Sequence, residues 1–354
     1  MKALRGQVRS KILDALATCV RDVPFVEGAP IPEKAKQGET HPDLIFKLPY
    51  SGGDQVIIVE YTNPGQPRLV RNAVNQLLRY LEMKPEAYGV VAAPYISPRA
   101  ADICAEDGIG YIDLAGNCRL SFGGVHIERK GSPNPFSEKR DLRSLYSPKA
   151  SRILRVLLSA PKTIWRIQPL AKEVEVSVGL VSKVKKLLGD REWIAEQAAG
   201  FQLVEAEVLL TEWAENYTYR KNLVREFYCS ITVPEVEAQI ADVLGEKGIK
   251  YALTGFSGAD RMAPFVRYHR VMAYVEESDE DVGALLNLKE VTGGSNVLLL
   301  KPYDAGVFYG SREIEGVRVA SPTQVYLDLL GDRGRGRDAA KELLEQVIRP
   351  TWHR

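Results

Sequence analysis

The stretch 177-SVGLVSKVKKLLGD-190 predicts an amphipathic helix. At about 100° per residue its apolar side chains fall on one face, which comprises Leu180, Val181, Val184, Leu187 and Leu188. The opposite face carries Gly179, Ser182, Lys183 and Lys186, with Lys185 on the flank and Ser177 placed as the N-cap. An ordinary solvated surface helix has the same pattern, so the neighbouring segments must decide what the basic face does.

The segments around this helix have the order of a winged helix-turn-helix. A helix over 148–160, a helix over about 167–174 and a turn precede it, and a pair of short strands around Gly200 follows it within 193–204. Residues 163–165 are placed to form a short strand before the second helix. The run 170-LAKEVEVSVGLVSKVKKL-187 resembles the winged-helix domains of bacterial transcription regulators. A winged helix that binds protein, or is purely structural, is the alternative.

The resemblance implies that the 177–190 helix enters the major groove of duplex DNA. Lysine contacts to phosphate give affinity without sequence information, whereas short serine side chains can reach base edges. A glycine at position 179 would let the helix backbone approach closely. The predicted DNA-binding residues are Lys162, Arg166, Ser177, Gly179, Ser182, Lys183, Lys185 and Lys186.

Length and composition set broader limits. At 354 residues two or three domains are expected, and 45% hydrophobic with 26% charged residues is typical of a globular protein. A net charge of +1 gives no global attraction to nucleic acid or membrane, so binding needs a local patch. No apolar run approaches the roughly 20 residues of a membrane span, and the N-terminus reads as an amphipathic helix instead of a signal peptide.

Four scattered cysteines lack metal-ligand spacing. They are Cys19, Cys104, Cys118 and Cys229. We expect reduced, unpaired thiols and a cytoplasmic protein.

Residues 1–132 alternate helical and extended segments, which predicts an α/β domain with a mixed sheet. Strands are expected over 43–48, 55–62, 88–96 and 109–114, helices over 68–82 and 98–106, and a hairpin over 118–129 around Gly123-Gly124. Pro42-Asp43, Glu60 and 76-QLLRY-80 resemble the motifs of the PD-(D/E)xK, or restriction-endonuclease-like, fold, the last matching its QxxxY helix motif.

That resemblance implies a nuclease site that has lost a part. In an active member the aspartate and glutamate would hold Mg²⁺, and a lysine two residues after the glutamate would activate water. Here that position is Thr62, which leaves a degenerate site of Asp43, Glu60, Thr62, Gln76 and Tyr80. A Mg²⁺-dependent endonuclease remains an alternative if a lysine, arginine or glutamine lies beside the two carboxylates. Surface carboxylates at strand ends and an ordinary helical pair are the plain interpretation.

A polar, proline-bearing stretch over 133–147 reads as a linker, and the region 205–354 reads as a third, α/β domain that begins with a long helix over 206–221. The stretch 249–277 resembles the core of nucleotidyltransferase-like domains, in which a turn after a strand cradles phosphates. Thr254, Gly255 and Ser257 supply the turn, but Val271 and Ala273 stand where metal-binding carboxylates would be needed. The resemblance therefore implies a degenerate site without metal or phosphoryl transfer.

The run 318-RVASPTQVYLDLLGDRGRGRDAAKELL-344 is similar to AbiEi-type proteins, the antitoxin and transcription-regulator members of type IV toxin–antitoxin systems. Ser321-Pro322 is placed to start a helix, with serine as N-cap. Arg333, Arg335 and Arg337 are spaced by glycines and predict a basic loop.

Taken together, the segments predict an α/β multidomain protein with a restriction-endonuclease-like domain (1–132), a linker (133–147), a winged helix-turn-helix (148–204) and a nucleotidyltransferase-like, AbiEi-like domain (205–354). The expected function is a DNA-binding transcriptional regulator, specifically an antitoxin-like autorepressor. Expected partners are double-stranded DNA, a cognate toxin operon or protein partner and a second copy as homodimer, with no membrane. No cofactor is expected, and Mg²⁺ enters only with the endonuclease alternative. A protein-interaction scaffold is the other alternative.

Overall fold

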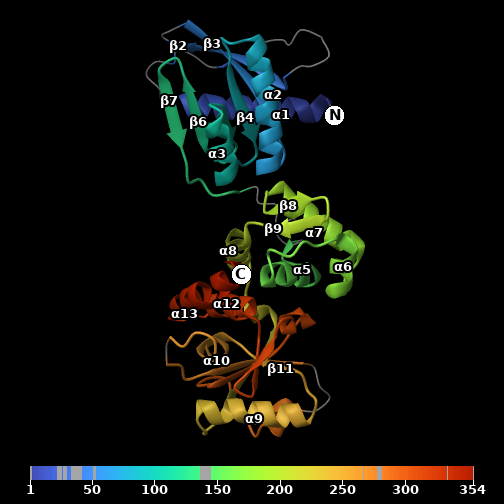
Figure 1. Ribbon diagram of the computed structural model, residues 1–354. Helices are drawn as coiled ribbons and strands as arrows, with labels where there is room; N and C mark the ends of the chain where they lie inside the picture. The colour runs from blue at the N-terminus through green and yellow to red at the C-terminus, as the bar shows by residue number, and fades with distance from the viewer. Residues whose placement is uncertain are drawn as a thin grey trace. The chain divides into compact units, whose positions relative to one another are not determined.

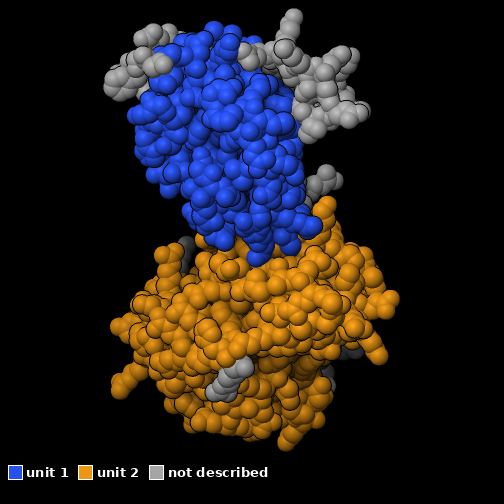
Figure 2. All heavy atoms as spheres, turned by 45° about the horizontal axis from the view of Figure 1, so that its top comes forward, with its two compact units in different colours: residues 1–138, 189–192 blue, residues 139–188, 193–354 orange. Residues whose placement is uncertain are grey.

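The computed structural model describes residues 2–21, 26, 30–32, 42–50, 53–135, 145–265, 267–276, 281–332 and 334–353. The chain divides into two compact units, which Figure 2 shows in different colours. Unit 1 comprises residues 1–138 with 189–192, and unit 2 comprises residues 139–188 with 193–354. Each unit contains a seven-stranded sheet of parallel and antiparallel strands, so the prediction of an α/β protein with mixed sheets is confirmed.

Unit 1 is one mixed sheet whose strands lie in sequence order from β1 to β7. Strands β3, β4 and β5 run parallel, and the other neighbours are antiparallel. Parallel neighbours need a crossover connection, which α2 and α3 provide. The elements are α1 Lys2–Val20, β1 Ile31–Pro32, β2 Leu44–Tyr50, β3 Gly53–Tyr61, α2 Pro67–Met83, β4 Tyr88–Ala93, α3 Pro98–Glu106, β5 Gly110–Asp113, β6 Cys118–Phe122 and β7 Val125–Arg129.

Helices cover both faces of this sheet (Figure 1). Leu16 of α1 is buried in one core with Ile57 and Val59 of β3. Leu77 of α2 is buried in a second core with Ile58. Because successive strand residues point to opposite faces, β3 contributes to both cores and is apolar over its second half. These buried faces explain why the predicted strands and helices of this segment are present.

The β6–β7 connection is the tight hairpin that the sequence predicts. Gly123 and Gly124 have φ angles of +51° and +81°, which L side chains rarely adopt. Two positive φ angles are what a type I′ turn requires, and this turn suits the twist of paired strands.

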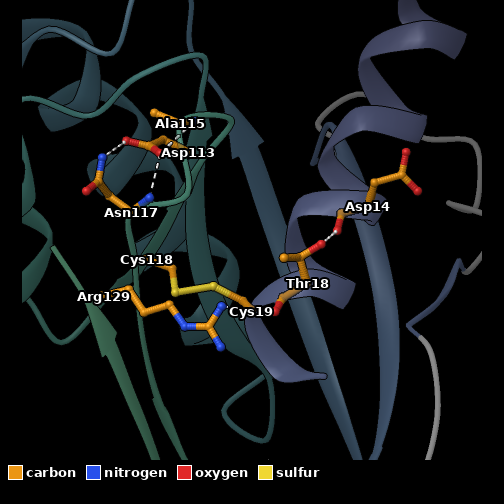
Figure 3. Close-up of a disulfide and its surroundings, with 8 residues drawn as sticks. All are labelled: Asp14, Thr18, Cys19, Asp113, Ala115, Asn117, Cys118 and Arg129. Atoms are coloured by element: carbon orange, nitrogen blue, oxygen red, sulfur yellow. Dashed lines mark hydrogen bonds between the residues drawn. A yellow bond between two sulfur atoms is a disulfide. The ribbon is translucent and has the colours of Figure 1, made fainter. Parts of the chain in front are cut away.

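Two of the cysteines differ from the prediction. Cys19 of α1 and Cys118 of β6 form a disulfide, although 99 residues separate them in the sequence (Figure 3). Both side chains lie in the core between α1 and the sheet, a proximity that cysteine spacing could not reveal. Cys104 and Cys229 are free thiols. The expectation of four reduced thiols is therefore wrong for this pair.

The disulfide also removes the main support for the predicted compartment. A cytoplasmic location was the simplest account of reduced thiols, and it stays a prediction. Among the described residues, no helix is both long and apolar enough to cross a membrane.

Unit 2 starts with three helices and a hairpin, in the order predicted for the winged helix. They are α5 Pro148–Ser159, α6 Ile167–Glu173, α7 Val178–Asp190, β8 Ile194–Gln197 and β9 Gly200–Leu203. Residues 189–192, which include the last two residues of α7, group with unit 1. Of the predicted linker, residues 133–135 and 145–147 are described, whereas 136–144 lie outside the described residues.

The rest of unit 2 is a sheet with the order β13-β10-β14-β12-β11-β16-β15, in which β12 with β14 and β11 with β16 are the parallel pairs. Helix α9 lies on one side of the sheet, and α12 and α13 lie on the other (Figure 1). The elements are α8 Ala206–Glu215, η1 Tyr219–Lys221, β10 Leu223–Tyr228, α9 Val233–Glu246, β11 Tyr251–Leu253, α10 Gly255–Asp260, β12 Val271–Val275, α11 Val282–Leu285, β13 Lys289–Glu290, β14 Val297–Lys301, η2 Ala305–Phe308, β15 Arg312–Ile314, β16 Val317–Val319, α12 Pro322–Leu330, α13 Gly336–Leu343, η3 Leu344–Ile348 and α14 Arg349–His353.

The three-helix segment and the C-terminal sheet share one hydrophobic core. Leu154 of α5, Leu188 of α7 and Leu329 of α12 are fully buried members of it. Eight of the twelve residues of α5 are buried, Ser151 and Arg155 among them, so several elements must cover this helix. Residues 204 and 205 both lie within unit 2, and the domain boundary between them stays a prediction.

The predicted long helix over 206–221 is shorter in the structure. Helix α8 ends at Glu215, and the chain turns at Asn216 before the short 3₁₀ turn η1, which Thr218 caps. This break allows the Tyr217 side chain to enter the core, where its hydroxyl donates to Asp328. A tertiary hydrogen bond thus outweighs local helical preference.

Candidate nucleic-acid interface

Helix α7 is anchored by the apolar stripe that its sequence predicts. Val181, Val184 and Leu188 are at most 1% exposed, and they lie in the core that α5 also enters. The Ser177 hydroxyl accepts the Leu180 N–H at 3.2 Å, which is the predicted N-cap. Because the stripe and the cap fix the rotation of the helix, they also fix which side chains face solvent.

The wing is a two-stranded hairpin with one extra backbone pairing. Trp165 exchanges two backbone hydrogen bonds with Phe201, at 2.8 and 2.9 Å. The predicted strand over 163–165 is thus reduced to a single bridge. At Gly200 an added Cβ would lie 2.3 Å from the Trp165 carbonyl oxygen, so only glycine permits this approach.

Four predicted residues form a solvent-exposed surface on α7. Gly179, Ser182, Lys183 and Lys186 are all exposed. Among the described residues, neither lysine has a carboxylate within ion-pair distance. A Cβ added at Gly179 would meet nothing within 4 Å, so packing within this chain does not require the glycine. We call these four residues the α7 basic face.

Lys185 does not belong to this face. Its ammonium lies 3.0 Å from the Glu196 carboxylate of β8 and 5.6 Å from the centre of the Phe201 ring. These contacts join the helix to the wing and leave the side chain mostly buried. The sequence places Lys185 on the flank, and that flank is the one the wing covers.

Lys162 and Arg166 also have partners within unit 2. The Lys162 ammonium donates to the His353 carbonyl oxygen at 2.6 Å. Arg166 Nε donates to the Ala199 carbonyl oxygen at 3.1 Å, which ties the wing to the start of α6. Both side chains are exposed, but their polar groups are already engaged. The predicted DNA-binding set therefore divides into an accessible group on α7 and a group that holds the wing and the C-terminus.

Unit 1 brings together the residues of the predicted nuclease motifs. Gln76 of α2 donates its amide to Glu60 Oε1 at 3.2 Å and to the Tyr80 hydroxyl at 2.9 Å. The Asp43 carboxylate accepts the Tyr61 N–H at 3.0 Å, which places it beside Glu60 at the end of β3. The Thr62 hydroxyl is buried without a hydrogen-bond partner among the described residues. Glu60, Thr62 and Gln76 line a hollow of about 290 Å³.

The carboxyl of Glu60 has an unusual environment. It is 6% exposed, and burial together with the neighbouring Asp43 carboxylate raises its pKa from the usual 4.5 to about 7. A lysine at position 62 would oppose this shift, but Thr62 carries no charge. The Gln76 amide is a polar neighbour of the kind that keeps the nuclease alternative open, yet it supplies no ammonium.

The raised pKa predicts how the stability of unit 1 changes with pH. Between about 4.5 and about 7 the native state holds a proton on Glu60 that the unfolded state releases. The free energy of unfolding should therefore fall as pH rises through this range. Glu60→Gln, which cannot ionise, should lose this component and should be more stable than wild type at pH 8, with little difference at pH 4.

Calorimetric unfolding of the full chain between pH 4 and 8 measures this difference. Glu82→Gln, an exposed position on the same helix as Gln76, is the matched control and should not alter the pH profile. Parallel pH profiles for wild type and Glu60→Gln would contradict the expectation.

The carboxylate pair fits Mg²⁺ only in part. Mg²⁺ is usually held by one or two carboxylates together with waters and substrate phosphates. Asp43 and Glu60 would supply the carboxylates. Among the described residues, no group of three or more histidine, cysteine or acidic side chains could hold a metal. If Mg²⁺ were bound, it would polarise a phosphate and activate water. In this chain Glu60 must first lose its proton, and Thr62 supplies no ammonium group.

The predicted nucleotidyltransferase turn is buried. Thr254 and Ser257 have no exposed surface, and Ser257 accepts the Met272 N–H at 3.3 Å. Val271 and Ala273 are equally buried, but in the core beneath α9, on the other face of the sheet. Ala273 pairs with Leu253 beside the turn, but its side chain and that of Val271 lie on the face of the sheet opposite the Asp328 contact of Thr254. Gly255 has φ +56° and begins α10 against Met272.

A buried polar network occupies the face of the sheet next to this turn. The Asp328 carboxylate accepts hydrogen bonds from Thr254, Tyr217 and Tyr274 at 2.5, 2.6 and 3.0 Å. It also accepts from the Gln324 amide, whose oxygen binds the guanidinium of buried Arg155. Burial raises the pKa of Asp328, while the hydrogen bonds of this network oppose the rise. The network links α5, β12 and α12 inside unit 2.

Sequence reasoning missed this network. The signal was Gln324 and Asp328, two polar residues one helical turn apart on the buried side of an otherwise apolar helix. The Ser321 N-cap of the same helix is as predicted, because its hydroxyl accepts the Gln324 N–H.

Residues 202–349 match the model of a family described as transcriptional regulator, AbiEi antitoxin, type IV TA system. The AbiEi match starts inside β9 and ends at the first residue of α14, so it includes the whole C-terminal sheet and the Asp328 network. It does not extend to α7 or to unit 1. Arg335 and Arg337, in the predicted basic loop of this region, are exposed, and Arg333 lies outside the described residues.

Two solved structures show a partial likeness, "Structure of EndoMS in apo form" and "Structure of EndoMS-dsDNA2 complex". Each is 16% identical with a TM-score of 0.20 and covers 28% of this chain. This chain spans 45% and 43% of their lengths, respectively, so under half of either. Likeness at this level assigns no fold, and the restriction-endonuclease-like fold of unit 1 stays a prediction. No curated protein matches the sequence.

Proposed function

We propose that this chain is a DNA-binding transcriptional regulator, with unit 2 as an antitoxin-like autorepressor that binds duplex DNA through α7. The observation that carries the proposal is the α7 basic face. Its two lysines are exposed and unpaired among the described residues, and a glycine and a serine beside them leave room for a ligand. This arrangement suits a helix that lies in the major groove with its lysines on phosphates.

The AbiEi match supports the regulatory part of the proposal. The matched segment shares a core with the helices of the winged helix, so binding by α7 and any activity of the matched segment would belong to one folded body. The partner would then be the operator of a toxin–antitoxin operon or a cognate toxin protein. A homodimer on two half-sites is part of the proposal, since regulators with this motif commonly bind as dimers.

A salt titration of DNA binding tests the proposal. Purified full-length chain is titrated with duplex from its own upstream region and with random duplex, at several salt concentrations. We expect tighter binding to the upstream duplex and a linear fall of log affinity with log salt, with a slope of about −0.9 for each phosphate contacted. Equal, weak binding to both duplexes at about 0.15 M salt would contradict a sequence-reading regulator.

A Mg²⁺-dependent DNA endonuclease is the second candidate function. The assembled Asp43, Glu60 and Gln76 cluster beside a 290 Å³ hollow favours it, and Thr62 in place of the lysine weighs against it. Under the regulator proposal we expect DNA to remain intact with about 5 mM Mg²⁺, a concentration ample for Mg²⁺ sites formed with phosphates. Cleavage that Glu60→Gln abolishes and Glu82→Gln leaves unchanged would establish the endonuclease.

The same experiments distinguish the alternative that the protein is an interaction scaffold. If neither duplex binds and no cleavage occurs, unit 2 would act on protein partners only. The unpaired lysines of α7 argue against this, because isolated positive charges on a helix favour a polyanion over an apolar protein surface.

A further inference from the structure

A second hollow, of about 280 Å³, opens on unit 2 beside β10 and β14. Its lining includes Tyr219, Arg220, Asn222, Glu226 and Arg270. None of the residues assigned to the α7 basic face, the nuclease motif or the nucleotidyltransferase turn takes part. The function of this hollow is therefore separate from that of the sites described above.

Two arginines give this hollow its charge. Arg220 and Arg270 are both exposed, and among the described residues neither has a carboxylate within ion-pair distance. Glu226 is the one acidic side chain of the lining, and its carboxylate accepts the Ser295 hydroxyl at 2.7 Å. Two unpaired guanidinium groups on one concave surface create a local positive potential in a chain whose net charge is only +1.

The backbone that carries Arg220 is held in place. Its N–H donates to the Thr218 hydroxyl at 3.3 Å, and the Asn222 amide donates to the Tyr219 carbonyl oxygen at 2.7 Å. The guanidinium carbon lies 5.6 Å from the centre of the Tyr219 ring, within reach of a cation–π interaction. The two hydrogen bonds fix the backbone of this turn and the ring contact restricts the guanidinium, which reduces the entropy lost on binding.

Arg270 comes from a different element. It immediately precedes β12, a fully buried strand in the middle of the sheet, and the Val271 N–H is bound to the Asn296 carbonyl oxygen at 2.9 Å. Two segments 50 residues apart in the sequence thus present guanidinium groups to the same hollow. Lys221 and His269, the sequence neighbours of Arg220 and Arg270, are also exposed, as is Arg267.

We propose that this hollow is a binding pocket for a phosphate group. A guanidinium presents a planar fork of N–H donors that matches phosphate oxygens, and two such groups can bind one phosphate from two sides. The phosphate could belong to the backbone of duplex DNA or to a free nucleotide, since both present the same charged oxygens. The free-nucleotide source does not depend on DNA binding by α7.

Calorimetric titration of the full chain with inorganic phosphate and with ATP, in chloride buffer at fixed ionic strength, tests the pocket. The variant Arg220→Gln with Arg270→Gln removes both guanidinium groups from exposed positions. Arg312→Gln with Arg318→Gln is the matched control, because these exposed arginines lie on β15 and β16 at the other end of the sheet. For wild type and control we expect saturable binding, and for the pocket variant a Kd at least about tenfold higher, as expected for loss of charged hydrogen bonds.

A second titration, with duplex DNA, separates the two sources. If the pocket takes backbone phosphates, the pocket variant also binds duplex more weakly and its salt slope falls by about 1 to 2. If it takes a free nucleotide, duplex affinity is unchanged while ATP binding is lost. The proposal is overturned if the pocket variant matches wild type in every titration, or if the control variant loses as much. A wild-type chain that binds ATP but no duplex would keep the pocket and remove only the regulator proposal.

Discussion

Replacing Lys183 and Lys186 together by glutamate is expected to weaken duplex DNA binding by about a hundredfold or more at about 0.1 M salt. Each lysine on the α7 basic face is exposed and unpaired within the described part of the chain, so each is free to neutralise a phosphate. The substitution removes two attractions and adds two repulsions. It should also make the slope of log affinity against log salt shallower by about 2.

The matched control is Lys289→Glu with Lys341→Glu, which changes the net charge by the same amount at exposed positions of β13 and α13. We expect near-wild-type affinity for this control and an unchanged melting temperature for both variants. A gel-shift titration at fixed salt compares them. Equal affinity for wild type and the α7 variant would remove α7 as the DNA-binding element, and an equal loss in the control would reduce the effect to net charge.

Asp328→Ala is expected to lower the free energy of unfolding of unit 2 by about 3 to 5 kcal/mol, as for removal of one member of a buried charged network. Asp328 is 1% exposed and is the common acceptor for Thr254, Tyr217 and Tyr274. Its loss removes the shared acceptor of these hydroxyl groups and leaves Tyr217 and Tyr274 only each other at 3.0 Å. It also removes an acceptor of the Gln324 amide, whose oxygen binds the guanidinium of buried Arg155.

Tryptophan fluorescence during denaturation isolates this effect. All four tryptophans of the chain, at 165, 193, 213 and 352, belong to unit 2, so the signal reports that unit alone. Asp242→Ala, an exposed position on α9, is the control and should shift the midpoint little. A loss below about 1 kcal/mol for Asp328→Ala, the range of ordinary surface substitutions, would mean that the network is not a structural element of unit 2.

Local periodicity and motif spacing predicted much of the two sites. The apolar stripe of α7 required only a helical period, and its rotation in the structure follows that stripe. The spacing of Asp43, Glu60 and Gln76 placed them together because β2 and β3 pair with Leu44 opposite Val59 and α2 follows directly. Both features involve elements that are close in the sequence, so a sequence pattern can indicate them.

Contacts between distant segments could not be predicted in the same way. Lys185 lies on the side of α7 that the wing covers, where it pairs with Glu196, and Lys183 does not. Which side the wing covers is decided by tertiary packing. Cys19 pairs with Cys118 because α1 lies on the sheet, and nothing local records that. The role of Asp328 could not be predicted, since its four donors come from elements spread over more than 100 residues.

The single core of unit 2 bears on how such a protein can arise or be rebuilt. A DNA-binding domain with a hydrophobic core of its own can be moved between proteins by recombination at a linker. Here buried residues of α5, α7 and α12 belong to one hydrophobic core, so a cut between residues 204 and 205 would expose apolar surface on both fragments. A transplanted piece would therefore have to carry both the three-helix segment and the C-terminal sheet to keep this core covered.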